Sequence, residues 1–361
     1  MFSRLLVTGG AGFIGSNFIR YVLMKYPDSF ILNLDLLTYA GSLENLNNLP
    51  ANAKYHFEKV DICDQNSVIE LMRKYDIDAI VHFAAESHVD RSILGPAAFV
   101  NTNILGTFSV LEAAREVWFN EQKLTDTNVR FHHISTDEVF GSLEPGDQAF
   151  SETTPYSPNS PYAASKASSD HLVRAYHHTY GLPITLTNCS NNYGPFQFPE
   201  KLIPLMILNA LEGKHLPIYG DGMQIRDWLY VEDHCQAIWK VLQEGKIGDT
   251  YNVGGNNQPA NIEIVDAICE LIDEFRPDSK FIPHVNLKEY VTDRPGHDRR
   301  YAMNISKIAR ELNWKPKYNL KDGLRKTVEW YLSNQEWIDA IRKQQQYNDW
   351  VKENYSKRGI K

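Results

Sequence analysis

A short apolar strand, a glycine-rich turn and a helix follow one another at the start of the chain, and few folds accommodate that order. Residues 4–8 form the expected strand, Gly9, Gly12 and Gly15 give the pattern G-x-x-G-x-x-G, and residues 15–25 form the expected helix. Glycines at this spacing permit a tight turn, a close approach of backbone N–H groups to a pyrophosphate, and packing of the helix on the sheet. The order of these elements therefore predicts a dinucleotide-binding site.

The rest of the first half alternates strands and helices, which predicts right-handed crossovers and a parallel sheet. Further strands are expected at residues 30–35, 79–84, 129–135 and 184–188, and helices at residues 67–75, 101–118 and 161–180. We expect an α/β protein with a Rossmann-type doubly wound sheet and a smaller C-terminal substrate-binding lobe. The predicted division is residues 1–190, residues 191–334 with some segments returning to the first domain, and a helical tail at residues 335–361. The charge of this tail predicts a surface helix.

Composition narrows the possible partners and location. The formal net charge is −8 with both signs mixed along the chain, so no basic face for nucleic acid is expected. The four cysteines form no paired spacing, which predicts neither disulfides nor a metal site. No apolar run approaches the roughly 20 residues that span a bilayer, and no signal peptide precedes the first strand. We expect a cytoplasmic protein.

Asp35 ends the second predicted strand, twenty residues after Gly15. A carboxylate at this place accepts the ribose hydroxyls and repels an added 2′-phosphate, so NAD is favoured over NADP. The alternative interpretation is a helix cap or a turn residue.

Tyr162 and Lys166 stand four positions apart on the helix that Ser160 and Pro161 open, so both project from one face. Lowering a tyrosine pKa from about 10 toward neutrality costs about 4 kcal/mol, which a neighbouring ammonium and a nicotinamide charge can supply. Such a phenolate could remove a hydroxyl proton during hydride transfer. An exposed Tyr–Lys pair is the alternative, and the nearby dinucleotide loop favours the catalytic interpretation.

Thr136, Asp137 and Glu138 directly follow the strand that ends at Ser135. Adjacent acids in a partly desolvated cleft repel each other, which raises one pKa and separates their roles. One acid could then protonate a leaving hydroxyl while the other acts as a base. The alternative is an acidic turn at the rim of the sheet.

Nine strings of the sequence, including Thr-Gly-Gly-Ala-Gly-Phe-Ile-Gly (8–15) and Ser-Thr-Asp-Glu-Val-Phe-Gly (135–141), resemble the dTDP-glucose 4,6-dehydratase family of the extended short-chain dehydrogenase/reductase superfamily. The others are residues 35–41, 83–92, 160–166, 191–204, 217–222, 226–234 and 293–301. The acid pair after Thr136 separates this family from related epimerases and decarboxylases. Leu36 and Asn304 depart from the lysine and aspartate common at those positions.

The resemblance implies two sets of contacts around the catalytic residues Thr136, Asp137, Glu138, Tyr162 and Lys166. The implied NAD contacts are Gly9, Gly12, Phe13, Ile14, Gly15, Asp35, Leu36, Leu37, Thr38, Asp61, Ile62, Phe83, Ala84, Ala85, Glu86, Ser87, Thr102, Tyr162, Lys166 and Asn192. The implied substrate contacts are Ser87, Thr136, Asn191, Lys201, Leu202, Pro217, Ile218, Tyr219, Arg226, Asn261, Asp293, Arg294, Pro295, Gly296 and His297. Arg226 and Arg294 offer guanidinium forks that match diphosphate oxygens.

The implied reaction is dehydration of dTDP-glucose, or a closely related nucleotide sugar, with tightly bound NAD that is regenerated in every turnover. Tyr162 would take the O4 proton, Glu138 the C5 proton, and Asp137 would protonate the departing C6 hydroxyl. A homodimer through a four-helix bundle is also expected. Two alternatives remain open: a UDP-sugar epimerase or decarboxylase on the same scaffold, and a non-catalytic NAD-binding regulator.

Overall fold

Seven short strands pair into one parallel sheet in the order β10-β6-β5-β4-β1-β2-β3. The structure is a computed structural model that describes residues 1–123 and 129–343 of the chain. The strands are β1 (Arg4–Thr8), β2 (Phe30–Leu34), β3 (Lys54–Glu58), β4 (Ala79–His82), β5 (Arg130–Thr136), β6 (Ile184–Cys189) and β10 (Thr250–Val253). The Rossmann-type parallel sheet predicted from the sequence is confirmed.

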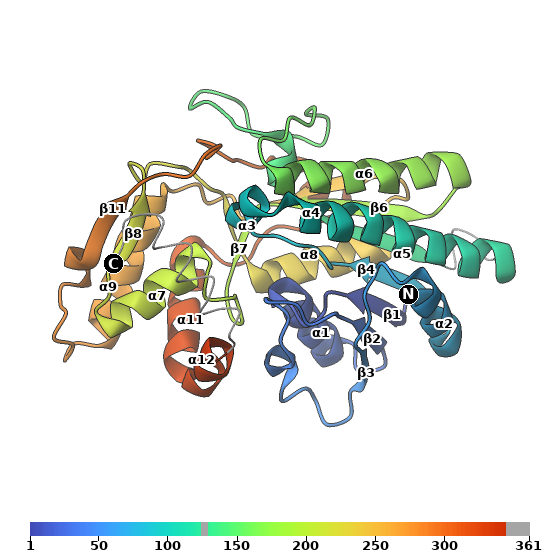
Figure 1. Ribbon diagram of the computed structural model, residues 1–361, viewed down its shortest axis with the longest axis horizontal. Coiled ribbons are helices and arrows are strands. Elements are labelled where there is room, and N and C mark those ends of the chain that lie inside the picture. Colours follow the sequence, from blue (N-terminus) through green and yellow to red (C-terminus); the bar gives the residue numbers. More distant parts are fainter. Residues whose placement is uncertain (124–128, 344–361) are drawn as a thin grey trace.

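Both faces of the sheet are covered by helices, so its central strands are buried at nearly every position (Figure 1). Leu5 and Val7 of β1 pack with residues of α1 and α8, whereas Leu6 packs with residues of α2, α5 and α6 on the opposite face. The helices are α1 (Phe13–Lys25), α2 (Gln65–Tyr75), α5 (Thr107–Ala114), α6 (Pro161–Tyr180) and α8 (Val231–Glu244).

The helix predicted at residues 101–118 is the middle of a longer helical run. Two short helices, α3 (Val89–Leu94) and α4 (Pro96–Phe99), precede it. Segments with π-helical hydrogen bonds, Val100–Gly106 and Arg115–Glu121, flank α5 on either side. Pro96 at the first helical position explains why a new helix begins after Gly95.

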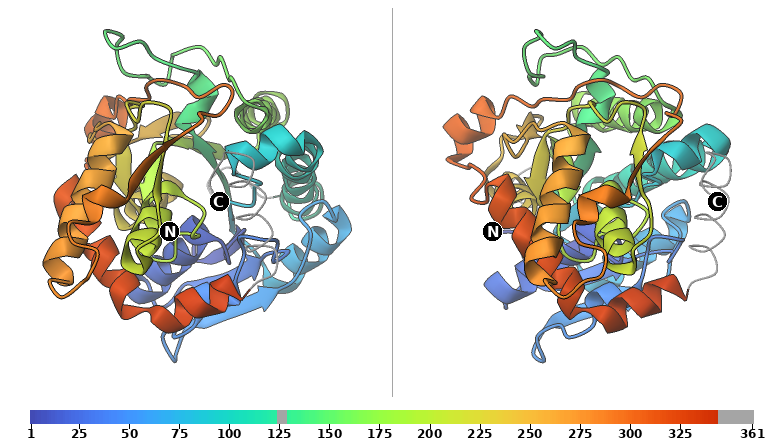
Figure 2. Two further views of the ribbon diagram at one scale, coloured as in Figure 1. Left: turned by 60° about the vertical axis from the view of Figure 1, so that its left-hand side comes forward. Right: turned by 90° about the vertical axis from the view of Figure 1, so that its left-hand side faces the viewer.

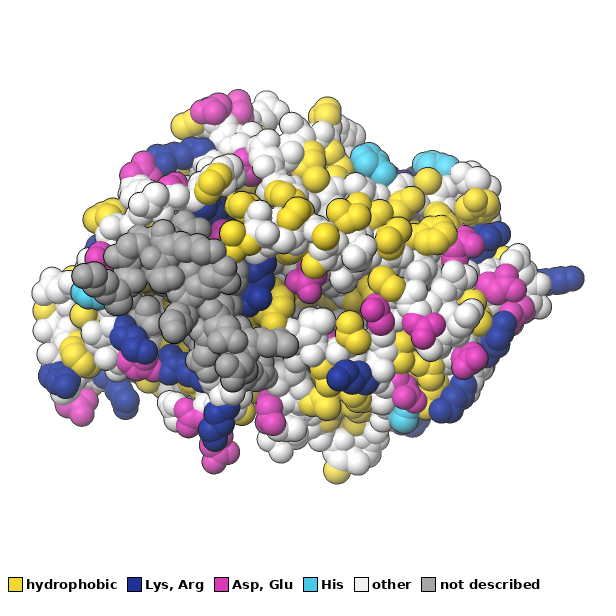
Figure 3. All heavy atoms as spheres, in the orientation of Figure 1, with side chains coloured by type: hydrophobic (Ala, Val, Ile, Leu, Met, Phe, Trp, Pro, Cys, Tyr) yellow, Lys and Arg dark blue, Asp and Glu magenta, His cyan; other side chains and the backbone are white. Residues whose placement is uncertain are grey.

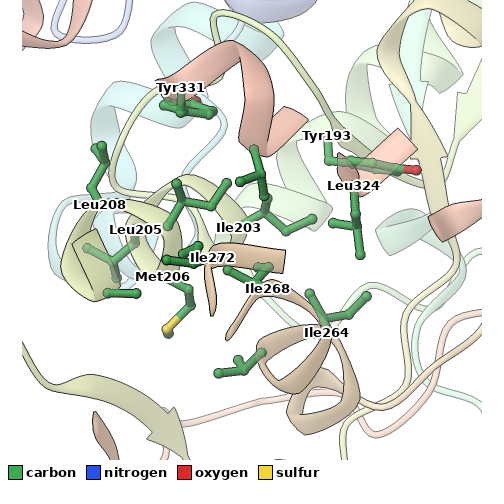
Figure 4. Packing of buried hydrophobic residues seen from close by; sticks show 14 of the residues in the cluster. Tyr193, Ile203, Leu205, Met206, Leu208, Ile264, Ile268, Ile272, Leu324 and Tyr331 are labelled. Atoms are coloured by element: carbon green, nitrogen blue, oxygen red, sulfur yellow. The ribbon is translucent and has the colours of Figure 1, made fainter. Parts of the chain in front are cut away.

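A second, smaller core lies beside one end of the sheet. It is built from apolar faces of α7 (Leu202–Glu212), α9 (Asn261–Phe275), α11 (Leu320–Ser333) and α12 (Gln335–Arg342). In both views of Figure 2 the orange α9 lies against the yellow-green α7. Figure 4 shows how Ile203, Met206, Ile264, Ile268, Ile272 and Leu324 from three of these helices point toward one another.

Two small parallel sheets lie between this second core and the carboxyl ends of the strands of the large sheet. They pair β7 (Asn191–Tyr193) with β9 (Trp228–Tyr230), and β8 (Leu216–Tyr219) with β11 (Lys288–Val291). β10 and α10 (Ser306–Leu312) pack at the β6 edge of the large sheet although they follow β7 in the chain. The division at residues 1–190, 191–334 and 335–361 stays a prediction.

The C-terminal segment differs from the surface helix that its charge suggests. Trp337, Ile338 and Ile341 of α12 are buried in the second core, and the Trp337 indole donates to the side-chain oxygen of Asn45 at 2.8 Å. The composition of the whole tail hides this short amphipathic stretch, and residues 344–361 lie outside the described residues. Among the described helices, none combines the length and apolar character that crossing a bilayer requires.

Candidate active site

The polar residues predicted for catalysis begin where β5 ends. Thr136 closes β5, and a short 3-10 helix (Asp137–Phe140) starts directly after it. The Thr136 hydroxyl caps this helix by accepting the Glu138 backbone N–H at 3.3 Å. This cap holds both acids at the carboxyl edge of the sheet, where ligands bind in parallel α/β folds.

Asp137 is buried, with 2% of its surface exposed. Burial raises the pKa of its carboxyl group well above the usual value, and the charges of Glu138 and Asp227 raise it further. Oδ1 accepts a hydrogen bond from the Thr136 hydroxyl at 3.2 Å. Within residues 1–123 and 129–343 nothing hydrogen-bonds to buried Oδ2. The side chain is therefore suited to hold a proton and to present it at Oδ2.

Glu138 has a different electrostatic environment from its neighbour. Burial raises the pKa of its carboxyl group, but the nearby cations Arg294, Lys201 and Arg226 oppose that shift. Glu138 also lines the cavity described below, whereas Asp137 is not among its lining residues. Burial raises the pKa of both adjacent acids, and Glu138 is the one whose shift three cations oppose, so their division into acid and base stays a prediction.

Tyr162 and Lys166 project from the first turns of α6. The Ser160 hydroxyl caps this helix by accepting the Ala163 N–H at 3.1 Å, and Pro161 occupies the first helical position. Both side chains are buried, so the exposed Tyr–Lys pair considered as an alternative is excluded. Lys166 Nζ donates to the carbonyl oxygen of Ile134 at 2.8 Å.

The electrostatics of Tyr162 differ from the sequence-based expectation. Burial raises the pKa of its phenol well above 10, and the charge of Glu138 raises it further, while a hydrogen bond with Thr136 lowers it. The downward shift that catalysis needs must therefore come from positive charge brought close to the phenol. The geometry also places the Thr136 hydroxyl between Tyr162 and Asp137, which links the two catalytic pairs.

The glycine-rich turn fits a dinucleotide. A Cβ atom at Gly9 would lie 2.6 Å from the backbone nitrogen of Ala84, and one at Gly15 would lie 2.4 Å from the carbonyl oxygen of Gly9. Gly12 meets only that same oxygen, at 3.3 Å, and caps α1 without a side chain. The N-terminal N–H groups of α1 consequently remain available to a pyrophosphate.

Asp35 follows β2 and is buried beside this turn. Its Oδ2 accepts the Ala11 N–H at 2.9 Å and its Oδ1 accepts the Leu37 N–H at 2.8 Å. Because a carboxylate has about four acceptor positions, these bonds leave capacity for ribose hydroxyls. The residue thus serves as a turn brace, one of the roles weighed from the sequence, and also has the chemistry for an NAD contact.

The other predicted cofactor residues lie along the same edge. Residues 83–87 follow β4, and residues 61–62 follow β3, where the Asp61 carboxylate accepts the Cys63 N–H at 2.9 Å. Thr102 lies in the π-helical segment before α5. Asn192 lies in β7, with its side-chain oxygen 2.9 Å from His234 Nδ1. Their contacts with NAD stay a prediction.

A cavity of about 190 Å³ opens between the carboxyl edge and the second core. It is lined by most of the residues that the sequence predicts for the substrate: Ser87, Asn191, Lys201, Leu202, Pro217, Ile218, Tyr219, Arg226, Asn261, Arg294 and His297. Four others fall outside this lining, namely Thr136, Asp293, Pro295 and Gly296. Asp293 instead accepts from Gln224 at 2.9 Å and lies 2.6 Å from His297 Nδ1, so it orients a residue of the cavity wall.

The cavity is also lined by residues that sequence reasoning missed: His88, Val89, Asp90, Gln197, Glu200, Leu205, Met206, Gly222, Trp228 and Val265. Asp90 pairs with Arg294 at 3.2 Å, and Glu200 pairs with Arg91 at 3.1 Å. Both acids lie within strings that resemble the family, residues 83–92 and 191–204, and this resemblance could have identified them. Their pairing was not visible, since Asp90 and Arg294 are 204 positions apart in the chain.

Three cations, Lys201, Arg226 and Arg294, line the cavity together with three acids, Asp90, Glu138 and Glu200. Arg226 is 5% exposed and is fixed by hydrogen bonds to the carbonyl oxygens of Ile225 and Asp298, at 2.8 and 2.9 Å. Within the described part of the chain, the buried Nε of Arg294 has no hydrogen-bond partner. Two held guanidinium groups beside Lys201 suit a diphosphate.

Comparisons with known proteins agree with this geometry. The profile of the GDP-mannose 4,6 dehydratase family matches residues 6–327. A dTDP-glucose 4,6-dehydratase of Salmonella typhimurium is 54% identical over 363 residues, which cover 98% of this chain and 99% of that relative.

Two solved structures are similar in fold as well as in sequence. The dTDP-glucose 4,6-dehydratase of Bacillus anthracis in complex with NAD has a TM-score of 0.83 and 45% identity, covering 94% of this chain and 99% of the other. The enzyme of the same name from Streptomyces venezuelae, with NAD and TYD bound, has a TM-score of 0.84 and 45% identity. The match covers 92% of this chain and 98% of the other.

Proposed function

The chain belongs to the dTDP-glucose 4,6-dehydratase family, and from this premise we propose how its own residues divide the work of the reaction. It is an NAD-dependent hydro-lyase that converts dTDP-glucose to dTDP-4-keto-6-deoxyglucose. The observation that carries the assignment of residues is the Thr136 hydroxyl, which donates to Asp137 at 3.2 Å and hydrogen-bonds with Tyr162.

Substrate binding falls to the cavity. Arg226, Arg294 and Lys201 bind the diphosphate, while Tyr219 and Asn261 on the far wall contact the nucleoside. With the diphosphate bound by these three cations, the glucose lies between Glu138 and Tyr162. Held in this way, C4, C5 and C6 come within reach of the three reacting side chains, which is where positioning contributes most to the rate.

The glycine turn and Asp35 hold NAD, which when bound accepts the C4 hydride and returns it to C6. Tyr162 takes the O4 proton as that hydride leaves. Glu138 removes the C5 proton, which the new ketone has made acidic, and Asp137 donates its proton to the departing C6 hydroxyl. Loss of water is then complete, and Glu138 returns its proton to C5, which restores its own carboxylate and the C5–C6 single bond.

The proton balance of this sequence assigns a second task to Thr136. Each turnover leaves Tyr162 with the O4 proton and Asp137 without the proton it gave to water. The Thr136 hydroxyl donates to Asp137 at 3.2 Å and hydrogen-bonds with Tyr162. It can accept a proton from the phenol and pass its own to the carboxylate, which resets both groups without solvent.

We also propose a homodimer. Large apolar side chains are exposed along the run from α3 to α5, among them Leu94, Val100, Leu105 and Phe108. Figure 3 shows hydrophobic side chains gathered over this side of the molecule. Replacing Leu105 and Phe108 together by glutamate should yield monomers in sedimentation analysis. A wild-type chain that sediments as a monomer would contradict the proposal. A cytoplasmic location stays a prediction.

Product analysis tests the function against its two alternatives. The purified protein is incubated with dTDP-glucose and with a panel of UDP-sugars, and the masses of the products are measured by mass spectrometry. We expect loss of one water from dTDP-glucose. Loss of carbon dioxide or an unchanged mass with inverted C4 would favour the decarboxylase or epimerase, and no product from any sugar would favour the regulator.

A further inference from the structure

The catalytic pair is the first half of a longer series on α6. Tyr162, Lys166, Asp170 and Arg174 are spaced by four residues each, so they project from one face of the helix. Their side chains are a phenol, an ammonium, a carboxylate and a guanidinium, which alternate in charge beyond the phenol. The proposed function uses only the first two members.

Asp170 is completely buried and tightly held. Its Oδ2 accepts hydrogen bonds from the Ser135 hydroxyl and from the Tyr156 hydroxyl, both at 2.8 Å. Its Oδ1 lies 3.2 Å from Nε2 of His133, which is also buried. The two hydroxyl donors at Oδ2 fix the position of the carboxylate, while Oδ1 has the approach of His133 but no hydrogen-bond partner within the described residues.

The carboxylate is ionised despite its burial. Burial raises the pKa of Asp170, but His133 and the charges of Lys166 and Arg174 outweigh it, and the net shift is downward. Arg174 closes the outer end of the series by donating to Tyr156 at 2.7 Å and to Thr250 at 3.2 Å. Lys166 lies one helical turn before Asp170, and Nε2 of His133 stands near both, 3.4 Å from Lys166 Nζ and 3.2 Å from Asp170 Oδ1.

Lys166 depends on this charge. Its side chain is buried, burial lowers the pKa of its ammonium group, and the Asp170 carboxylate opposes that change. Two other titratable groups face it: His133, 3.4 Å from Nζ, and the Cys189 thiol. Burial and the charge of Lys166 lower the pKa of His133 to about 4, so that imidazole is neutral. Burial raises the pKa of the thiol, so Asp170 is the anion that faces Lys166.

We propose that Asp170 is a positioning residue of the catalytic centre, which keeps Lys166 charged and in place so that Tyr162 can act as a base. This inference rests on the proposed function. The groups that face Tyr162 from the other side, Glu138 and Asp137, both disfavour its phenolate. The supporting charge must then come along α6, and Asp170 secures it.

The test compares Asp170→Asn with Asp170→Glu, which restores the charge. In the Asn variant the buried ammonium loses its counterion, Lys166 becomes neutral at lower pH, and phenolate formation becomes harder. The acidic limb of the kcat/KM profile should move upward, by about one pH unit for a tenfold loss at neutral pH. The kinetic isotope effect with C4-deuterated substrate should increase, because C4 oxidation becomes rate-limiting. Asp170→Glu should recover part of both readouts.

A role limited to packing would leave the pH profile and the isotope effect unchanged, and that result overturns the inference. Tyr156→Phe serves as the matched control, since it removes the hydroxyl that bonds to the carboxylate and to Arg174 but removes no charge. If Asp170→Asn does not fold, Arg174→Gln at the half-buried outer end of the α6 series takes its place in the test. We expect smaller changes of the pH profile and of the isotope effect in the same direction. A wild-type protein that forms no keto-sugar would instead refute the proposed function.

Discussion

Replacing Asp137 by Asn is the most direct test of how the adjacent acids divide their roles. The change keeps the shape of the side chain, and its amide oxygen can still accept the Thr136 hydroxyl. Only the donated proton is lost. General acid catalysis contributes roughly 10²- to 10⁴-fold, or about 3 to 5 kcal/mol. Asp137 is 2% exposed and Oδ2 has no partner in the described residues, so no other donor replaces it and we expect the upper end.

The assay separates oxidation at C4 from loss of water. In a single-turnover experiment with dTDP-glucose, the near-ultraviolet absorbance of reduced nicotinamide should rise at close to the wild-type rate and then persist. Mass analysis of quenched samples should show the sugar retaining its C6 oxygen. The exposed Asp278→Asn is a matched control, which should behave as wild type in both measurements.

One result would refute the reasoning on Asp137. If water is lost from the substrate at an undiminished rate in the Asn variant, the C6 hydroxyl receives its proton from another group. A parallel loss of C4 oxidation and elimination would point instead to a disturbed site, and Asp137→Glu would then show whether an acid in this place restores turnover.

Three further predictions address the hydride, the proton and a buried acid. Deuterium placed at C4 should appear at C6 of the same product molecule, and wash-out into water would contradict the internal return. The Thr136→Val variant should release one product per site in a burst and then turn over slowly. Small weak acids in the buffer should restore the steady-state rate. If the burst is slowed as much as the steady state, Thr136 is not a proton relay. Burial raises the pKa of Asp227 to about 6 from 3.8, so its stabilising contribution is full below pH 3.8 and is lost as pH rises through 6. Urea unfolding should then show Asp227→Asn gaining about 3 kcal/mol on wild type between pH 4 and pH 7, and a constant difference would refute the shift.

Local chemistry made much of the first domain predictable. The glycine turn, the strand that ends at Thr136 and the helix opened by Ser160 and Pro161 are each specified by neighbouring residues. Backbone conformation, capping and the burial of strands depend on short stretches of sequence, and those were read correctly. β3 was missed because its polar and apolar side chains leave it only half-buried, with no continuous apolar run.

Features that depend on distant partners were not visible in the sequence. The charge of Asp170 matters because His133 and Ser135, more than thirty positions earlier, meet it from β5. α12 is held in place because Trp337 donates a hydrogen bond to Asn45, which lies nearly three hundred positions away in the chain. Each of these residues looks ordinary among its neighbours, so only the fold reveals what it contacts.

Burial acts on the acid and on the base in the same direction, and this explains the arrangement of charges around them. It raises the pKa of Asp137, which suits a proton donor, and it raises the pKa of Tyr162, which opposes a base. A dry site serves both groups only if positive charge reaches one of them selectively. The cations of the cavity wall act on Glu138, whereas we propose that the charge for Tyr162 comes from Lys166, one helical turn further along α6. That buried ammonium needs its own anion, and Asp170 stands one helical turn beyond it.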